Sequence, residues 1–489
     1  MRTSLWSGIR ILVLTAGASV VLSAGASAAD IVPEWLARLP VGASLSAGHG
    51  GMVVDQAGNT YVTATGGSSS NTDIVTAAYA ADGALLWSRT FDGAAGWHDQ
   101  ARGLVLGPDG VLYVTGNTPD PLSYAQVLVL AYDTTTGELL RVIQPVSGPS
   151  NSEHGGSVAV DGAGHIVVAG GTTGDGGDAL VMAFTPTGDI AWRRTWDGPA
   201  WAPYSQDTAL KVLVDPGGDP VVMMHGVMGS NQPDYVVVKY AAATGATLWQ
   251  ATWGVNGGDY PRDMAIDSHG DVYVTGTGID MIDKYSTVKF RGSDGSLVWQ
   301  AYDSAAVDNA AAGVALDGAG GVYVTGSVDP DGDHSNLNDD IYTVKRAADT
   351  GSLLWTHRYG ASCLWCYDVP ADVIADPSGH VFVGGTTSSP PYTSDAILLV
   401  LDGATGAETH RGIVSGGAVE TSGWRELRLD GSSNLRAAGH IQNANTGFLD
   451  VSVAKYAAIG PPTLPCRFWN RAAACAIAPV AEVGSTGKR

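Results

Sequence analysis

The chain has 489 residues, a formal net charge of −22, and a composition that includes 66 Gly, 14 Trp and 18 Tyr. An acidic body repels phosphate backbones, so we do not expect nucleic acid as a partner. After residue 30 no segment combines helical periodicity with the length of a membrane span, and the many glycine turns and aromatic residues favour an all-β protein without a membrane span.

The first 29 residues have the features of a secretory signal. Arg2 and Arg10 supply positive charge, and the apolar run 11–22 is too short to cross a bilayer. Ala26-Ser27-Ala28 forms a small-residue cleavage site. We therefore expect an exported protein, secreted or periplasmic, whose mature chain begins near Ala29 or Asp30.

One sequence unit recurs eight times between residues 30 and 460. Each unit has a strand, an Asp/Gly-rich turn, a second strand of the type Tyr-Val-Thr-Gly, a polar loop, a third strand, and a short turn into a fourth strand. A repeated four-stranded meander predicts an all-β, eight-bladed β-propeller of four-stranded antiparallel blades, with seven blades as the alternative. The eight turn aspartates are Asp55, Asp109, Asp161, Asp215, Asp267, Asp317, Asp376 and Asp430.

The eighth unit contains only three predicted strands, at 424–429, 435–440 and 449–456. Near the N-terminus, Glu34–Arg38 has the pattern of the fourth strand at Leu85–Arg89. We infer that this N-terminal strand completes the last blade and closes the ring. In units one to seven, the same structural position of the fourth strand is held by Trp87, Arg141, Trp192, Trp249, Trp299, Trp355 and His410. Trp35 would then hold this position in the eighth unit.

The pattern D-x-x-G-x-x-Y-V-T-G, followed by D-x-x-x-x-K-Y and G-x-x-L-W, resembles the bacterial SBBP β-propeller repeat family. The fourth-strand segments 241–249 and 347–355 are also similar to the tryptophan-docking motif of eight-bladed quinoprotein (PQQ) propellers. Together these resemblances cover 34–458 and imply the fold. Quinoprotein dehydrogenases carry long insertions and an adjacent Cys-Cys pair over the cofactor, whereas this chain has minimal blades and two residues between Cys363 and Cys366. PQQ is therefore not an expected cofactor.

The four cysteines form two close pairs, Cys363 with Cys366 and Cys466 with Cys475. In an exported protein, two local structural disulfides are the expected arrangement, although four cysteines allow three connectivities. The second pair lies in a C-terminal tail, 461–489, that does not fit the repeat.

The long connections of a propeller meander are expected on one face. The loops between strands two and three and the blade-to-blade connections lie there, and the short turns lie on the other face. Loops on a rigid scaffold often carry sites, and rings beside carboxylates suit a sugar or a cationic ligand. The candidate ligand-binding residues on this loop-rich face are Trp97, His98, Asp99, Glu153, His154, Trp201, Tyr204, Asp259, Tyr260, Trp365, Tyr367 and Asp368. The alternative is that the acids before strand one bond the loop backbone.

A candidate Ca²⁺ loop lies within the sixth unit. Oxygen-bearing residues occupy positions 1, 3, 5, 7 and 12 of a calcium-loop pattern. The glycine expected at position six is His334, and Asp340 also matches the aspartate that opens strand three in other units. Both interpretations stay open for this set, which comprises Asp329, Asp331, Asp333, Ser335 and Asp340.

These features predict a monomeric, exported binding or interaction module with a protein or carbohydrate ligand. A propeller enzyme, carbohydrate-active or of the PQQ type, and a structural cell-envelope protein are the alternatives. No catalytic residue can be assigned, because neither a nucleophile elbow nor a zinc-protease motif nor a phosphate-binding loop is present.

Overall fold

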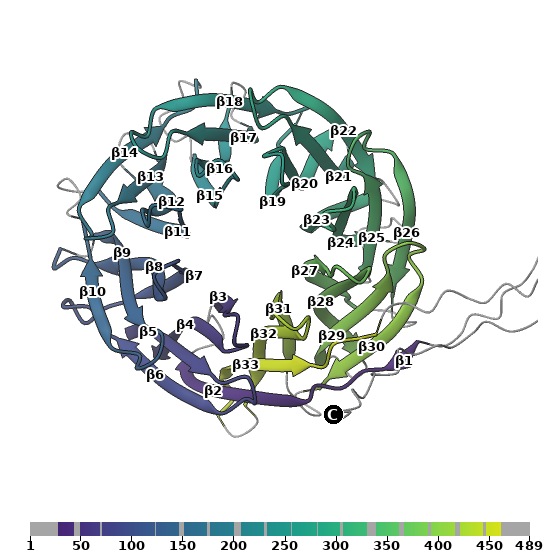
Figure 1. Cartoon of the computed structure of the whole chain (residues 1–489), viewed down its shortest axis with the longest axis horizontal. Helices are drawn as coiled ribbons and strands as arrows, with labels where there is room; N and C mark the ends of the chain where they lie inside the picture. The colour runs from purple at the N-terminus through teal and green to yellow at the C-terminus, as the bar shows by residue number, and fades with distance from the viewer. Residues whose placement is uncertain are drawn as a thin grey trace, which may run out of the picture.

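The structure is a computed structural model that describes residues 28–460 except 44–48, 69–70, 123, 146–150, 174–176, 200–206, 229–231, 256, 281, 304–306, 330–338, 361–365, 390–392, 416–420 and 444–445. Residues 1–27, which belong to the predicted signal segment, and the tail from residue 461 lie outside the described residues. Within the described part, eight antiparallel sheets are arranged radially around one axis, as Figure 1 shows. The predicted eight-bladed β-propeller is therefore confirmed.

The first four blades each consist of four consecutive strands, with the first strand innermost. Blade 1 contains β3 (His49–Val54), β4 (Thr60–Ser68), β5 (Asn71–Tyr79) and β6 (Leu85–Phe91). Blade 2 contains β7 (Gln100–Leu106), β8 (Val111–Pro119), β9 (Ala125–Asp133) and β10 (Leu139–Ile143). Blade 3 contains β11 (Glu153–Val160), β12 (Ile166–Thr172), β13 (Asp178–Phe184) and β14 (Ile190–Trp196). Blade 4 contains β15 (Thr208–Val214), β16 (Pro220–Val227), β17 (Pro233–Tyr240) and β18 (Thr247–Trp253).

The last four blades repeat this order, except that blade 8 takes its outer strand from the N-terminus. Blade 5 contains β19 (Tyr260–Ile266), β20 (Val272–Asp280), β21 (Ile282–Phe290) and β22 (Leu297–Asp303). Blade 6 contains β23 (Val307–Leu316), β24 (Gly321–Asp329), β25 (Asp340–Ala347) and β26 (Leu353–Tyr359). Blade 7 contains β27 (Val369–Ala375), β28 (His380–Ser389), β29 (Thr393–Asp402) and β30 (Glu408–Val414). Blade 8 contains β31 (Ser422–Leu429), β32 (Leu435–Gln442), β33 (Leu449–Tyr456) and β2 (Trp35–Ala43).

The two ends of the described chain close the ring, as predicted. Strand β2 pairs antiparallel with β33, and Trp35 lies opposite Lys455. An ion pair of 2.7 Å between Lys455 Nζ and Glu34 Oε2 adds to this pairing. Since β2 covers the outer edge of β33, blade 8 has the same four strands as the other blades and the ring is closed by strand pairing.

Blade 7 has a histidine at the tryptophan position, and a short strand that the sequence did not predict lies beside it. Strand β1 (Ala29–Asp30) pairs parallel with β30, and Ala29 lies opposite His410. The next blade has no turn between its third and fourth strands, because these come from opposite ends of the chain. A tryptophan at residue 410 would therefore have no turn on which to dock.

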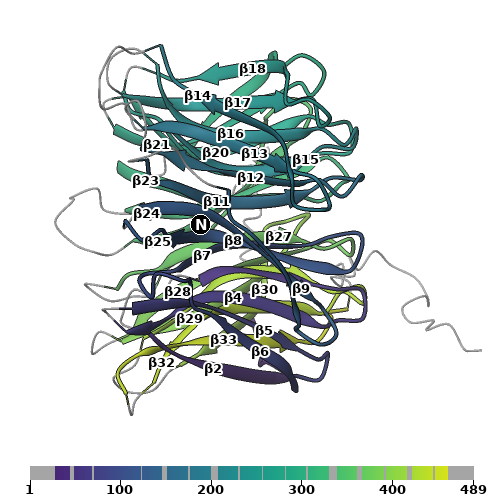
Figure 2. The ribbon, with the colours of Figure 1, turned by 90° about the vertical axis from the view of Figure 1, so that its left-hand side faces the viewer.

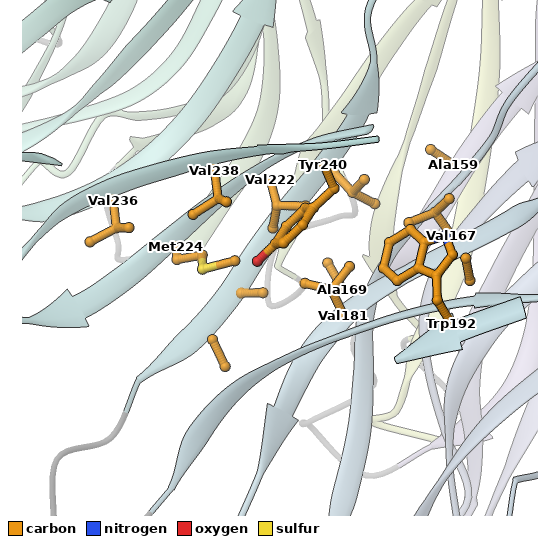
Figure 3. Packing of buried hydrophobic residues seen from close by; sticks show 14 residues of the cluster. Ala159, Val167, Ala169, Val181, Trp192, Val222, Met224, Val236, Val238 and Tyr240 are labelled. Atoms are coloured by element: carbon orange, nitrogen blue, oxygen red, sulfur yellow. The ribbon is translucent and has the colours of Figure 1, made fainter. Parts of the chain in front are cut away.

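The hydrophobic core is divided among the interfaces between blades. Each of the eight buried clusters within the described residues joins two successive blades. Figure 3 shows the interface of blades 3 and 4, where the rings of Trp192 and Tyr240 have centroids 5.8 Å apart. The middle strands are buried on both faces because each face packs against a different neighbouring blade.

The recurrent tryptophans dock onto the next blade. Trp192, for example, lies over Gly245, where a Cβ would come within 2.5 Å of the indole ring, and φ is +66°. Only glycine fits this turn without strain. The same contact recurs in six interfaces, with indole N–H···O=C bonds of 2.7–3.0 Å from Trp35, Trp87, Trp192, Trp249, Trp299 and Trp355 to the carbonyls of Ala81, Thr134, Ala242, Gly292, Ala348 and Gly403. In blade 2, Arg141 replaces the ring and donates to the Pro186 carbonyl at 2.6 Å.

The repeated Asp/Gly turns are structural elements of the short-turn face. Asp317 Oδ1 accepts backbone N–H bonds from Ala319 at 2.8 Å and Gly321 at 2.7 Å, and its Oδ2 accepts from the Tyr323 hydroxyl at 3.0 Å. Equivalent side-chain bonds close the turns at the other seven aspartates. Figure 2 shows the ring from its edge, with the strands running from one face to the other. None of the described residues belongs to a helix that is long and apolar enough to span a membrane.

Candidate functional site

The blade-to-blade connections are tied to the start of strand three in the preceding blade. Asp99 N–H donates to the Thr72 carbonyl at 2.7 Å, and Asp259 N–H donates to the Pro233 carbonyl at 2.6 Å. The amides of Asp207 and Asp368 make the corresponding bonds. The connections and the loops between strands two and three therefore meet on one face, which we call the loop-rich face.

The acids that precede strand one are buried and bonded to the loops. Asp99, Asp259 and Asp368 are each 0% exposed. Backbone amides of Gly93 (2.5 Å) and Val255 (2.6 Å) donate to Asp99 and Asp259, and the Thr387 hydroxyl donates to Asp368 at 2.5 Å. This placement favours the structural interpretation for these three carboxylates, because contact with a large ligand would need exposure.

Blade 3 begins with two further candidates that differ in their surroundings. Glu153 is 1% exposed and accepts a 2.7 Å bond from Arg193 Nη2. His154 is half-buried, and burial together with the nearby positive charge of Arg102 lowers the pKa of its imidazole. His154 is therefore a neutral side chain near an arginine at neutral pH.

Aromatic rings next to the buried acids reach solvent. Trp97 is 49% exposed, and Tyr260 and Tyr367 are each 41% exposed. His98 is also exposed, with Nδ1 3.4 Å from the Thr72 hydroxyl oxygen. Three separate connections thus present an accessible ring on the loop-rich face, as a surface for stacking against a ligand requires.

Several predicted site residues lie outside the described residues. They are the ligand-binding candidates Trp201, Tyr204 and Trp365, the calcium candidates Asp331, Asp333 and Ser335, and the cysteines Cys363, Cys466 and Cys475. Cys366 is buried, and both disulfides stay predictions. Asp329 and Asp340 are described and buried, and Asp340 pairs with Arg358 Nε, so that carboxylate already has a cationic partner. The calcium loop at 329–340 also stays a prediction.

The inner strands share a feature that the sequence did not reveal. Each of the eight has a β-bulge one to five residues after its start, where one residue has no partner on strand two. The inserted residues around the axis are Gly50, Arg102, Gly156, Leu210, Arg262, Ala312, Ala371 and Arg425. Three of the eight are arginines, all exposed, in a chain whose net charge is strongly negative.

An axial cavity of about 950 Å³ lies inside the ring and is lined by the inner strands of blades 8, 1, 2, 3 and 4. Arg102 and Arg425 belong to its lining. So do Thr421, His440 and Asp450, which lie at the ends of β31, β32 and β33 next to the loop-rich face. The cavity therefore extends to the same face as the exposed rings.

Residues that directly follow the bulges take part in ion pairs. Lys211 Nζ lies 2.5 Å from Asp263 Oδ1 of the next blade. Arg428 pairs with Asp372 of the preceding blade at 3.5 Å and more closely with Glu426 of its own strand. Arg102 differs, because its Nη2 donates a hydrogen bond of 2.7 Å to the side-chain oxygen Oε1 of Gln100. Within the described part of the chain, neither Arg102 nor Arg425 has a carboxylate partner, so both guanidinium groups can interact with a ligand.

One carboxyl group beside the cavity has an unusual pKa. Burial raises the pKa of Asp372 to about 7, against the opposing effects of Arg428 and of a hydrogen bond from Leu427 N–H. That amide lies 2.8 Å from Asp372 Oδ2 and belongs to the next blade, so the side chain joins two blades. This contact gives the Asp372 side chain a structural role, and its raised pKa makes the charge of that side chain depend on pH near neutrality.

The cavity does not fit PQQ, the cofactor that the quinoprotein resemblance would imply. A planar aromatic cofactor needs flat side chains above or below its ring. The described lining contains no Trp, Tyr or Phe, and only one imidazole, that of His440. No step is therefore assigned to PQQ in this chain.

The fold defines the class of this protein as an eight-bladed β-propeller with tryptophan-docked blades. A family model of PQQ-like repeats, described as outer membrane protein assembly factor BamB, matches residues 125–301, which is less than half of the chain. No curated protein sequence matches the chain. The resemblance to SBBP repeats stays a prediction.

Solved structures with similar folds include quinoprotein dehydrogenases. The quinohemoprotein alcohol dehydrogenase ADHIIG from Pseudomonas putida HK5 has a TM-score of 0.54 and 13% identity, over 89% of this chain and 78% of that one. The enzyme from Comamonas testosteroni has a TM-score of 0.53 and 13% identity, over 89% and 80%. A europium-containing methanol dehydrogenase has a TM-score of 0.53 and 12% identity, over 88% and 95%. At such identities the similarity concerns the fold alone.

Proposed function

We propose that this protein is an exported binding module that takes an anionic carbohydrate at the loop-rich end of its axial cavity. The observation that carries the proposal is the pair of exposed arginines, Arg102 and Arg425, which line the cavity and have no carboxylate partner within the described residues. A guanidinium group binds carboxylate or sulfate groups through two parallel hydrogen bonds.

The exposed rings supply the second half of the recognition chemistry. Trp97, Tyr260 and Tyr367 offer flat apolar surfaces for pyranose rings. Arg262 is the inserted residue of the bulge in blade 5. Burial and, to a smaller extent, the charge of Arg262 lower the pKa of His225. The His225 ring lies 5.5 Å from the Tyr260 ring, measured between centroids. Arginine and aromatic side chains therefore occur close together at more than one blade.

A binding role is also the better fit to the family match. The matching model is described as an assembly factor, which is a non-catalytic name, and the described cavity lining does not fit the cofactor of the dehydrogenases. The proposal therefore favours binding over catalysis. It rests on the geometry of the arginines rather than on the neighbours' names.

The test is calorimetric titration of the mature protein with uronic-acid and sulfated oligosaccharides beside neutral oligosaccharides of equal length. Wild type should prefer the acidic ligands and lose affinity as salt increases. Arg102→Gln combined with Arg425→Gln should weaken binding by about 100-fold or more, since each of the two lost charge-assisted hydrogen bonds contributes about 1.5–3 kcal/mol.

Arg89→Gln is the matched control. Arg89 is an exposed arginine on the outer strand of blade 1, where it donates to the Thr136 carbonyl at 2.7 Å. This variant should bind like wild type. Equal affinity for neutral and acidic oligosaccharides, or no binding to either class, would contradict the proposal, and the latter result would favour a structural envelope protein.

Export is tested separately. Cell fractionation and N-terminal sequencing should find the protein outside the cytoplasm with a first residue near Ala29 or Asp30. A cytoplasmic protein that retains residues 1–28 would contradict this part of the proposal.

A further inference from the structure

Three carboxylates meet where blades 1 and 2 join on the loop-rich face. Asp73 lies in β5 near its start, Asp92 follows β6, and Asp99 precedes β7. One oxygen of each carboxylate lies within 4.8 Å of the other two. Among the described residues, this is the one set of three or more potential metal-ligating side chains of the His, Cys, Asp and Glu types that come so close together.

Backbone bonds hold this corner in place. Asp99 N–H donates to the Thr72 carbonyl at 2.7 Å, and the Thr72 hydroxyl donates to the Asp99 carbonyl at 3.0 Å. Gly93 N–H donates to Asp99 Oδ2 at 2.5 Å. One carboxylate oxygen of Asp99 therefore holds the connection, while the other is left for a different partner.

Buried oxygens that make no hydrogen bond of good geometry within the described residues gather at the same corner. They include Asp99 Oδ1, Asp73 Oδ1 and the hydroxyl oxygen of Thr118, a residue that is 1% exposed. The Thr118 hydroxyl lies near enough to Asp99 to lower the pKa of that carboxyl, but burial outweighs this effect. A Cβ added to Gly93 would lie 2.2 Å from Thr118 Oγ1 and 2.8 Å from Asp99 Oδ1, so these two oxygens face the same small space. Buried oxygens without partners cost free energy, and a bound cation would satisfy several of them at once.

Among the described residues, the charged groups that act on Asp73 and Asp99 are all acids. Burial raises the pKa values of Asp73 and Asp99, and the charged neighbours that raise them further are acids, with Asp92 acting on both. Asp92 itself is exposed, so an ion can enter from solvent.

Blade 6 shows how the same repeat position is neutralised elsewhere. Asp340 and Asp368 occupy the places of Asp73 and Asp99, and the Asp368 amide makes the corresponding bond to the Asp339 carbonyl at 2.8 Å. Gly360 replaces the third acid, and Arg358 pairs with Asp340. The guanidinium group thus takes the role that a cation would have to take in blade 1.

From this geometry we propose that Asp73, Asp92, Asp99 and Thr118 bind one Ca²⁺ ion. Calcium accepts six to eight oxygen ligands in irregular arrangements, which suits three carboxylates, a hydroxyl and added water better than the strict octahedron of Mg²⁺ does. The bound ion joins strand three of blade 1 to the connection 92–99, which carries Trp97 and His98. The site is separate from the axial arginines, so its test does not depend on the proposed carbohydrate binding.

The test uses the mature protein freed of metal by a chelator, with CaCl₂ or MgCl₂ titrated in a calorimeter and Tm measured in parallel. We expect calcium binding, weaker magnesium binding, and a Tm increase of a few degrees at saturating calcium, because a ligand that binds only the folded state stabilises it. Asp92→Gly introduces the residue found in blade 6 and should weaken calcium binding at least tenfold.

Two further variants make the outcome specific. Asp197→Gly changes the equivalent position of blade 3, where the described residues form no such group, and should bind calcium like wild type. Thr90→Arg places an arginine opposite Val75, as Arg358 lies opposite Tyr342. It should abolish calcium binding while keeping the calcium-free Tm at or above that of wild type.

Three results would overturn the proposal. They are the absence of both heat and a Tm change with calcium in wild type, calcium binding that is unchanged in both Asp92→Gly and Thr90→Arg, and an equal loss of binding in Asp197→Gly.

Discussion

Aspartates at the two faces of the ring have opposite electrostatic surroundings. On the short-turn face, burial alone would raise the pKa of Asp317, but hydrogen bonds from the Gly321 and Ala319 amides and from Tyr323 outweigh burial and lower it. On the loop-rich face, burial and the charge of Asp259 raise the pKa of Asp234 to about 6. Burial also raises the pKa of Asp99, despite its bond from Gly93 N–H.

The difference shows that one residue type serves two purposes within one repeat. Where turn amides converge on the carboxylate, ionisation favours the folded state. Where acids are crowded and buried, their charge opposes folding unless a cation or a ligand compensates it. We therefore locate stability at the short-turn face and binding at the loop-rich face.

The largest effect on stability is expected from a deletion that opens the ring. Deleting 33–39 takes away most of β2 and opens the ring, exposing the cluster shared by blades 8 and 1. We expect Tm to fall by more than about 10 °C or the cooperative transition to disappear, as measured by circular dichroism. Deleting 28–31, which includes the two-residue β1, is the control with a smaller effect, and an unchanged Tm for the 33–39 deletion would contradict closure.

A second experiment removes the side-chain hydrogen bonds of one turn on the short-turn face. Asp317→Ala removes the acceptor for two amides and one hydroxyl, so urea unfolding should show a loss of about 2–4 kcal/mol. Asp317→Asn keeps acceptor oxygens and should lose less. If alanine and asparagine were equally tolerated, the turn aspartates would not be the source of stability that we assign to them.

A third experiment measures the pH dependence of stability for Asp372, a partly buried acid near the cavity. The folded-state pKa of Asp372, about 7, lies above its ordinary value of 3.8, so the folded state binds this proton more tightly. Its contribution to stability is present below about pH 4 and is lost as pH rises through about 7.

Asp372→Asn should therefore match wild type near pH 4 and exceed it at pH 8. Each pKa unit corresponds to about 1.4 kcal/mol, so the gain should be at most a few kcal/mol in urea unfolding at the two pH values. A variant that is less stable than wild type at pH 8 would show that the pair with Arg428 outweighs the cost of burial.

The smallest effect on stability is expected from Trp97→Ala. The ring is half exposed, so the free energy of unfolding should change by less than about 0.5 kcal/mol, while carbohydrate affinity falls. Trp87→Ala is the contrasting variant, since that ring is buried and bonded to the Thr134 carbonyl. It should cost about 3 kcal/mol, and similar losses for both variants would remove the distinction between docking and binding tryptophans.

The sequence by itself determined the architecture. Repeated turn aspartates, the period-two strands and the spacing from turn glycine to tryptophan are local patterns, because each depends on residues within one blade. They predicted eight blades, the role of the docking tryptophans, and closure through Trp35. These patterns did not fix the strand ends: β26 continues past the docking ring of Trp355 to Tyr359, because its backbone pairing with β25 extends that far.

Only the tertiary structure decided where function is to be sought. A bulge interrupts the alternation of each inner strand, so the sequence pattern could not show that Arg102 and Arg425 line one cavity. Asp73, Asp92 and Asp99 belong to two blades, and only their packing brings the three carboxylates together. Local patterns specify a blade through its own turns and strands, whereas the axis and the corners between blades arise from contacts between distant residues.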